Sequence, residues 1–231
     1  ERVAEWKKIG DCFPVYVEIG PTNWCNHDCL YCALDWVEKG IVRIDENVLC
    51  ENLEDMASHG VESIMFAGEG EPLGHQKLQK FVQVARKNGM EVYLTTNGVL
   101  LNRQRVEEIV PYLSWIRFSV DSPLKESYAK IHRHREGGND FESVWRNIGD
   151  AVEVGKKNPY EGFNVSVQAL LLSKNIGEIE TLAKMCKDNG VDNLQVKPYS
   201  PHPDSDPEKH EDLSVDFEEA RKLGEGLKPL E

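Results

Sequence analysis

The chain has 231 residues, 40% of them hydrophobic, and carries 27 Lys and Arg against 40 Asp and Glu, a formal charge of -13. This length suffices for one sizeable hydrophobic core, and the acidic excess repels phosphate backbones and anionic lipid, which argues against nucleic-acid and membrane partners. No apolar run approaches the roughly 20 residues of a bilayer span, and residues 1–10 lack a signal-peptide pattern, so a cytoplasmic location is predicted.

Apolar segments alternate with segments of helical spacing along the chain. Alternation over residues 15–19 indicates a strand that leads directly into a cysteine-rich stretch. A helical pattern over 46–58 ends at His59-Gly60 and is followed by a short apolar run over 63–67. The remaining predicted elements are helix 77–87, strand 91–94, helix 103–110, strand 115–120, helix 141–154, strand 163–172, helix 178–187, strand 194–197 and the beginning of one more helix over 215–223.

Strands separated by helical segments of this length predict right-handed crossovers and hence a parallel sheet, either doubly wound or curved as in a barrel. A loop of unusual polar chemistry follows each of the six strands, and all six loops would meet at the carboxyl ends, as in parallel barrels. A doubly wound sheet would gather fewer of them at its switch point. The predicted fold is therefore α/β, a partial (β/α)6 TIM-like barrel with parallel strands. Residues 1–200 are predicted to form the barrel core and 201–231 a linker and helix, leaving open a further domain beyond them.

Three of the six cysteines fall within one short stretch, Cys25-Asn26-His27-Asp28-Cys29-Leu30-Tyr31-Cys32. The spacing Cys-x-x-x-Cys-x-x-Cys allows three sulfurs to surround one metal centre. Zinc would need a fourth ligand, which His27 offers. A four-iron cluster is normally held by four thiolates, so three would leave one iron with an open coordination position. The residues alone permit either a structural zinc site or an iron–sulfur cluster.

This cysteine spacing, with aromatic Tyr31 just before Cys32, resembles the cluster motif of the radical S-adenosylmethionine (SAM) enzymes. The turn Gly68-Glu69-Gly70-Glu71-Pro72 is similar to the family's Gly-Gly-Glu-Pro turn, with Glu69 where the first glycine is usual. The resemblance implies that Cys25, Cys29 and Cys32 hold a 4Fe–4S cluster whose fourth iron is chelated by SAM. It also implies reductive cleavage of SAM to methionine and a 5'-deoxyadenosyl radical, which takes hydrogen from a substrate.

The resemblance covers almost the whole chain and implies further contacts with SAM. The glycine turn would bind the methionine amino group, the aromatic ring of Tyr31 would lie near the adenine, and hydroxyls after the third and fourth strands would hold carboxylate and ribose. Glycine at 68 and 70 would let the backbone approach the ligand. On the fifth strand, Ser166 and Gln168 point to one face by the period of two. The candidate cofactor-binding residues are Tyr31, Gly68, Gly70, Glu71, Thr95, Asn97, Ser119, Ser166 and Gln168.

Two polar stretches are candidates for substrate binding. His132-Arg133-His134-Arg135 is basic in an acidic chain and falls in the long loop predicted after the fourth strand, where Arg133 and Arg135 could fork onto a phosphate or carboxylate. The alternative is a solvated loop. Tyr199 and His202 belong to a proline-rich stretch that either shapes the pocket or leads the chain off the barrel. Lys197 and Asp121 are the candidates for an acid or base near the radical carbon.

The function predicted from these features is a radical SAM enzyme that acts on a small molecule or peptide, with a reductase such as flavodoxin or ferredoxin as electron donor. The alternative is a non-catalytic protein with an iron–sulfur electron-transfer centre or a structural zinc ion. Members of the family act on peptides, sugars, nucleosides and protein glycyl residues. The substrate and the outcome of the reaction are therefore left open.

Overall fold

The computed structural model describes residues 2–37, 40–158, 160, 162–210 and 212–227. Its centre is one six-stranded sheet in which every neighbouring pair is parallel and the strands follow their order in the sequence. A doubly wound sheet reverses its strand order at a switch point, whereas sequential order is that of a barrel. The predicted partial barrel is confirmed. The strands are β1 (Tyr16–Ile19), β2 (Ser63–Phe66), β3 (Glu91–Thr96), β4 (Trp115–Ser119), β5 (Asn164–Leu171) and β6 (Asn193–Pro198).

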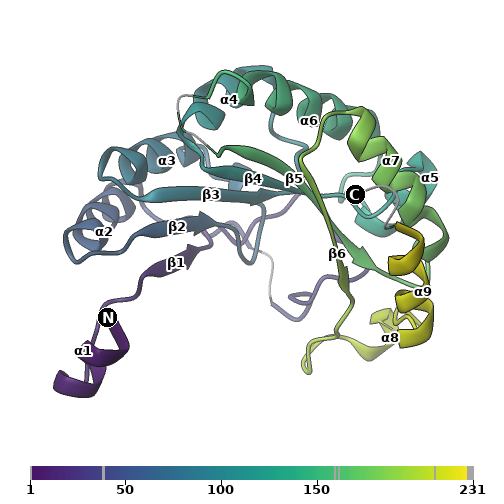
Figure 1. Cartoon of the computed structure of the whole chain (residues 1–231), viewed down its shortest axis with the longest axis horizontal. Coiled ribbons are helices and arrows are strands. Elements are labelled where there is room, and N and C mark those ends of the chain that lie inside the picture. Colours follow the sequence, from purple (N-terminus) through teal and green to yellow (C-terminus); the bar gives the residue numbers. More distant parts are fainter. Residues whose placement is uncertain (1, 38–39, 159, 161, 211, 228–231) are drawn as a thin grey trace.

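Helices follow one another around the outer side of this sheet (Figure 1). The structure contains each of the six predicted helices, with bounds within about two residues except at the C-terminal end of the last. Short 3-10 turns lie at Pro72–Gly74, Val110–Tyr112 and Ile176–Glu178. The α-helices are α1 (Arg2–Ile9), α2 (Glu46–Ser58), α3 (Leu78–Lys87), α4 (Arg103–Ile109), α5 (Lys125–His132), α6 (Phe141–Gly155), α7 (Ile179–Asp188), α8 (Pro207–His210) and α9 (Phe217–Leu227).

Three helices were not predicted, and one of them changes the surroundings of a candidate site. Helix α5 occupies much of the stretch that was expected to be a long loop after β4, so that expectation is wrong for residues 125–132. It has no side-chain N-cap, and only Tyr128, Ile131 and His132 are buried, which leaves a weak periodic pattern in the sequence. Helix α1 buries none of its residues, and α8 has four residues.

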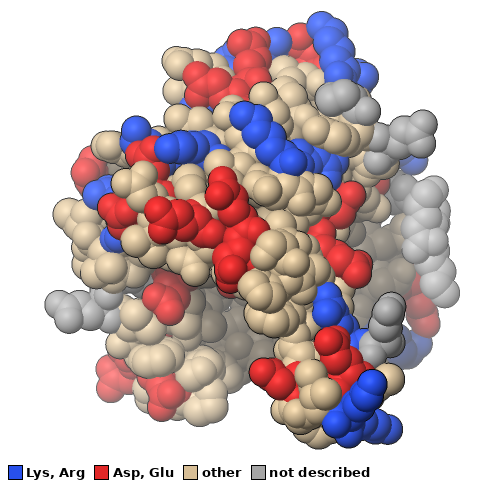
Figure 2. All heavy atoms as spheres, turned by 90° about the vertical axis from the view of Figure 1, so that its left-hand side faces the viewer, with Lys and Arg blue, Asp and Glu red and all other residues tan. Residues whose placement is uncertain are grey.

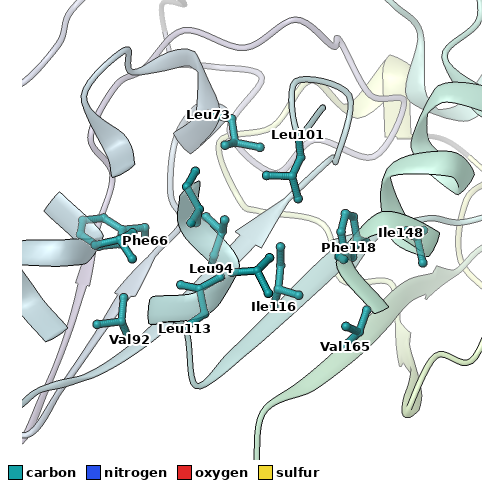
Figure 3. Packing of buried hydrophobic residues seen from close by; sticks show 14 of the residues in the cluster. Phe66, Leu73, Val92, Leu94, Leu101, Leu113, Ile116, Phe118, Ile148 and Val165 are labelled. Carbon is teal, nitrogen blue, oxygen red and sulfur yellow. The ribbon is translucent and has the colours of Figure 1, made fainter. Parts of the chain in front are cut away.

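The hydrophobic core lies between the sheet and its outer helices. Ile19, Phe66, Leu94, Ile116 and Val165 occupy one row across β1 to β5 and are all buried. Figure 3 shows several of these side chains together with residues from the covering segments. Because side chains alternate along a strand, the residues between the core positions face the concave side. On β5, this alternation buries every second residue from 165 to 171.

The concave side of the sheet carries polar and aromatic side chains near the middle strands. Tyr93 stacks on Trp115 with ring centroids 4.9 Å apart, and Arg117 lies 4.5 Å above the Trp115 ring. Arg117 also donates from Nη1 to Gln168 Oε1 at 3.3 Å. Such a half-buried mixture of aromatic and polar groups is a surface that can contact a ligand, in contrast to the apolar outer face.

The outer surface mixes charges of both signs. On the face in Figure 2, Lys and Arg side chains lie among Asp and Glu and do not form a continuous basic surface. Glu46 on α2, for example, pairs with Lys77 at 3.2 Å and Lys80 at 2.5 Å. None of the helices in the described part of the chain has the length and apolar character needed to cross a bilayer. The predicted absence of nucleic-acid partners stays a prediction.

The C-terminal helix packs on the barrel. Ala220 and Leu223 of α9 pack against the main core, on the side where α7 lies. The division of the chain at residue 200 stays a prediction, and residues 211 and 228–231 of the second part lie outside the described residues.

Candidate metal and cofactor site

A cavity of about 180 Å³ opens where the first strands of the barrel end. The cysteine stretch, the turn after β2 and the ends of β3 and β4 form its walls. Every residue predicted to bind the cluster or SAM lies in this lining except Ser166 and Gln168. The lining residues are Cys25, His27, Cys29, Tyr31, Cys32, Ala67, Gly68, Gly70, Glu71, Pro72, Thr95, Thr96, Asn97, Ser119 and His132.

The end of α5 and the residues that follow it hold the cysteine stretch by backbone hydrogen bonds. Asp28 N donates to Arg133 O at 2.9 Å, and Leu30 N donates to Ile131 O at 2.8 Å. His27 and His134 form an antiparallel bridge. Arg133 ends α5 at φ 43°, in the left-handed region, and this conformation turns the chain back along the cysteines. The shape of the cysteine loop therefore depends on a segment about 100 residues away in sequence.

The side chains of Arg133 and Arg135 contact the cysteine loop. Arg133 Nε donates to Asp28 O at 2.6 Å, and Arg135 Nε donates to His27 O at 3.2 Å. Their guanidinium groups lie 3.6 and 3.9 Å from the Asp28 carboxylate. Neither arginine lines the cavity. They were expected in a long loop after the fourth strand, and their role in binding substrate stays a prediction. In the structure both arginines hydrogen-bond the cysteine loop.

The glycine turn after β2 packs against the chain that leads into Cys25. A Cβ at Gly70 would lie 2.3 Å from Trp24 O and 2.6 Å from Thr22 O, and Glu71 N donates to Trp24 O at 2.8 Å. Gly68 has φ 107°, and a Cβ there would lie 2.8 Å from Gly20 Cα. The sequence suggested that glycine is needed for the approach of a ligand. In the structure, the approach of the protein's own backbone already requires it.

Replacing Gly70 with alanine is expected to displace residues 22–24 and with them the first cysteine. Because the atoms that block the Cβ are backbone atoms, we expect a loss of about 1–3 kcal/mol in the free energy of unfolding. Urea denaturation measures this loss. Gly149→Ala is the matched control, since no atom lies within 4 Å of a Cβ there and the site is inside α6. Helix propensity predicts a gain of up to about 1 kcal/mol for that variant, and an equal loss in both would contradict the argument.

Glu71 joins the glycine turn to the end of β3. Its Oε1 accepts from Thr96 Oγ1 at 2.5 Å and from Leu73 N at 3.1 Å, and its Oε2 accepts from Asn97 N at 2.8 Å. Burial raises the pKa of this carboxyl above its usual range, and the three donors only partly offset the effect. The Asn97 side chain continues the network by donating to Asn26 Oδ1 at 2.7 Å. The turn, β3 and the cysteine loop thus form one hydrogen-bonded unit.

The Cys29 thiol lies in surroundings that oppose its ionisation without a cation. Burial raises the pKa of the Cys29 thiol well above its usual range, and the neighbouring Cys25 and Asp121 raise it further. Burial and Asp121 likewise raise the pKa of Tyr31 well above its usual range. A bound metal supplies the positive charge that makes such thiols into thiolates.

The donor set in the cavity fits a cluster held by three thiolates. Three sulfurs line one wall, and Cys12, Cys50 and Cys186, the other cysteines, are absent from the lining. The described lining therefore offers no fourth sulfur. A cluster bound here would keep one iron without a protein thiolate, beside an open cavity.

Two histidines in the lining were not predicted as site residues. His27 entered the sequence argument only as a possible fourth zinc ligand, and His132 only as part of a basic stretch. His132 Nδ1 lies 3.7 Å from Cys29 Sγ. Burial and His132 lower the pKa of His27 to about 4. His132 is the last residue of α5, and this helix places it in the cavity wall. The helix was not predicted from the sequence, so the position of His132 was missed.

The remaining candidates lie outside the cavity lining. Ser166 and Gln168 share the concave face, as the period of two predicted, and Gln168 pairs with Ser119 in the sheet register. Asp121 is buried, and its Oδ1 accepts from Leu170 N at 2.6 Å. Lys197 is exposed on β6, opposite Leu170. The catalytic roles of Asp121 and Lys197 stay predictions.

Tyr199 and His202 contact the stretch that follows the third cysteine. The Tyr199 hydroxyl hydrogen-bonds His210 Nδ1, His210 Nε2 lies 3.2 Å from Asp35 Oδ2, and His202 stacks on Trp36 with centroids 5.3 Å apart. Neither residue lines the cavity, and their role in binding substrate stays a prediction. These contacts attach the segment after β6 to the cysteine stretch.

Asp35→Asn is expected to loosen this attachment. Burial raises the pKa of Asp35, but hydrogen bonds from Asp206 N and His210 lower it more, so the folded-state pKa lies below 3.8. The stabilising contribution is thus present above pH 3.8 and lost as the pH falls through the lower value. At neutral pH, we expect hydrogen exchange over residues 199–210 to speed up by roughly fivefold or more in the variant. Asp204→Asn, an exposed neighbour, is the control; equal exchange in both would contradict the prediction.

Comparison with known proteins agrees with this geometry. The family model for the radical SAM superfamily matches residues 19–186. The chain is 36% identical over 116 residues to an S-adenosylmethionine-dependent nucleotide dehydratase of Lacinutrix mariniflava, covering 47% of this chain and 24% of that protein. It is 29% identical over 216 residues to a probable GTP 3',8-cyclase of Methanococcus aeolicus, covering 89% and 66%. The chain thus spans only part of the length of these relatives.

Solved structures show the same fold. Streptococcus suis SuiB bound to S-adenosylmethionine superposes with a TM-score of 0.77 at 20% identity, covering 98% of this chain and 50% of that one. The chain belongs to the radical SAM superfamily. Enzymes of this superfamily use a 4Fe–4S cluster and SAM, so the predicted enzyme class and both predicted cofactors are confirmed at the level of the family.

Proposed function

We propose that this chain is the catalytic barrel of a radical SAM enzyme that abstracts hydrogen from a small-molecule or peptide substrate. The observation that carries the proposal is the single cavity that brings Cys25, Cys29 and Cys32 together with the glycine turn and the ends of β3 and β4. Family membership supports the same chemistry in general terms. When bound, the reduced cluster and SAM together supply a 5'-deoxyadenosyl radical at this place.

The three cysteines would hold the cluster, and the remaining lining would orient SAM. Thr95 and Ser119 present hydroxyls on the concave side, with Thr95 Oγ1 donating to Met65 Sδ at 3.6 Å, a weak bond that a better acceptor would replace. Tyr31 offers a ring in the same wall. Glu71 and Asn97 have their polar atoms bonded within the chain and would act by fixing the walls. The task of the protein is to hold the reacting groups in place and exclude water.

The concave face of the sheet would receive the substrate. Gln168 lies beside Ser119 in the sheet register, and Arg117 and Trp115 lie on the same face two and four residues from Ser119 towards the amino end of β4. Tyr93 pairs with Trp115 and stacks on it. Their chemistry suits a molecule with a planar or anionic group. An external one-electron donor such as a flavodoxin or ferredoxin would reduce the cluster.

Anaerobic reconstitution tests the proposed function. Protein loaded with iron and sulfide should retain about four iron atoms per chain. Addition of dithionite and SAM should then yield 5'-deoxyadenosine, detected by liquid chromatography, without any substrate added. Protein that retains the iron but forms no 5'-deoxyadenosine would contradict the enzymatic proposal and favour an electron-transfer centre.

A further inference from the structure

Three side chains in the cavity wall converge on one point, and two of them are histidines that a cluster held by three thiolates would not need. One ligand atom each of His27, Cys29 and His132 lies within 4.8 Å of the other two. All three residues line the cavity, and both histidines are almost fully buried, at 3% and 1% exposure. The ring centroids of the histidines are 5.5 Å apart. Two imidazole nitrogens and one sulfur at this separation form a donor set for a single borderline transition-metal ion.

The outer nitrogen of each histidine faces a carboxylate. His27 Nε2 lies 3.0 Å from Asp140 Oδ2, and His132 Nε2 lies 3.0 Å from Asp121 Oδ2. The Asp121 backbone N–H is also near His132 Nε2 but farther away, at 3.4 Å. The hydrogen bond to Asp140 favours a proton on Nε2 of His27. Asp121 Oδ2 is buried without a hydrogen-bond partner among the described residues, so an Nε2 proton on His132, left there when Nδ1 binds a metal, would supply one. Metal-binding histidines are commonly fixed in this way, with one nitrogen donating to a carboxylate and the other presenting its lone pair.

The contacts of Nδ1 in the two rings are consistent with a proton on Nε2. His27 Nδ1 is buried and has no hydrogen-bond partner among the described residues. His132 Nδ1 lies within hydrogen-bond distance of Cys29 Sγ, at 3.7 Å. A buried nitrogen without a partner is costly, and a metal ion would satisfy it. His75, another buried histidine, differs in having both of its ring nitrogens bonded, to Ile44 O and Lys77 N.

We propose that His27, Cys29 and His132 form a mononuclear site for Zn²⁺ when the iron–sulfur cluster is absent. The ion would displace the Cys29 thiol proton, and Asp140 and Asp121 would hold the two imidazoles in place. Cys29 would be shared between this site and the cluster site, so zinc and cluster would exclude each other. The mutual exclusion of zinc and cluster rests on the proposed role of Cys29 as a cluster ligand. The zinc site itself does not depend on that role.

The test uses cluster-free protein and Co²⁺ as a spectroscopic probe for Zn²⁺. Wild type should bind one Co²⁺ per chain with a sulfur-to-cobalt charge-transfer band, and Zn²⁺ should displace it. The double variant Cys25→Ala/Cys32→Ala should lose the iron–sulfur cluster but keep this band, because Cys29 and both histidines remain. His27→Gln and His132→Gln should each weaken Co²⁺ binding by at least about tenfold. His59→Gln, at the exposed C-terminal end of α2 and absent from the cavity lining, should bind as wild type does.

The outcomes separate this site from a zinc ion held by three thiolates and from the proposed enzymatic function. If the histidine variants bind Co²⁺ as tightly as wild type, the proposal is overturned. X-ray absorption at the zinc edge of wild type adds a measurement that needs no variant, with two nitrogens and one sulfur expected and three sulfurs contradicting it. All of these readouts are independent of SAM cleavage. A protein that cleaves SAM yet fails them would refute the zinc site alone.

Discussion

Cys29→Ala is expected to leave the chain folded, to prevent retention of the iron–sulfur cluster and to reduce 5'-deoxyadenosine formation to the level seen without protein. Cys29 lies between the other two cavity cysteines, and the described lining contains no further thiol to replace it. Two thiolates cannot hold a cluster that normally has four ligands. Iron analysis, absorbance of the reconstituted protein and chromatography of the products measure the three effects.

Cys50→Ala provides the matched control for this prediction. Cys50 lies on α2, is partly buried and does not line the cavity. We expect iron content and product formation of that variant to equal those of wild type, with at most a small loss of stability from packing. If Cys29→Ala retained as much iron as Cys50→Ala, the assignment of the cluster to the cysteine loop would be refuted. Melting curves of both variants show whether each is folded.

Local patterns predicted much of the fold because its elements are strongly periodic and clearly bounded. Asp45 caps helix α2 by accepting hydrogen bonds from Asn47 N and Val48 N, and an N-cap residue of this type is visible in the sequence. The parallel sheet follows from the length of the crossovers. Helix α5 lacks a capping side chain and is two turns long, so its pattern is too short to stand out.

The composition of the site could be predicted in part, but the interactions that shape it could not. The cysteine spacing and the glycine turn are local in sequence and point to cluster and cofactor. The pairing of the loop with residues 131–135 depends on where α5 ends, and the clash at Gly70 depends on how β2 lies against residues 22–24. Both are long-range packing effects, which leave no periodic signal. The basic residues were therefore predicted to lie in a long loop after the fourth strand, whereas Arg133 follows α5 directly and contacts the cysteine loop.

Glu71→Ala is expected to cause a large loss of stability and to loosen the cavity walls. The variant leaves the Thr96 hydroxyl and the backbone N–H groups of Leu73 and Asn97 without their acceptor. Each buried donor without a partner costs about 1–3 kcal/mol, so a total on the order of 3 kcal/mol is expected after relief of the buried charge. Urea denaturation measures this, and a loss below about 1 kcal/mol would show that water replaces the carboxylate.

Glu71→Gln removes the buried charge and one of the two acceptor oxygens, so the pH dependence of its stability relative to wild type isolates the effect of the charge. Burial raises the pKa of Glu71 above 4.5, its value when exposed. Below pH 4.5, the carboxyl is protonated in both folded and unfolded chains, so no charge is buried on folding. As the pH rises from 4.5 through the folded-state value, the folded chain must give up a proton it holds more tightly, and the free energy of unfolding falls. Wild type should therefore lose stability relative to Glu71→Gln across this window and hold a constant difference above it. A relative gain of wild type over the same range would mean that the three donors outweigh burial and depress the pKa.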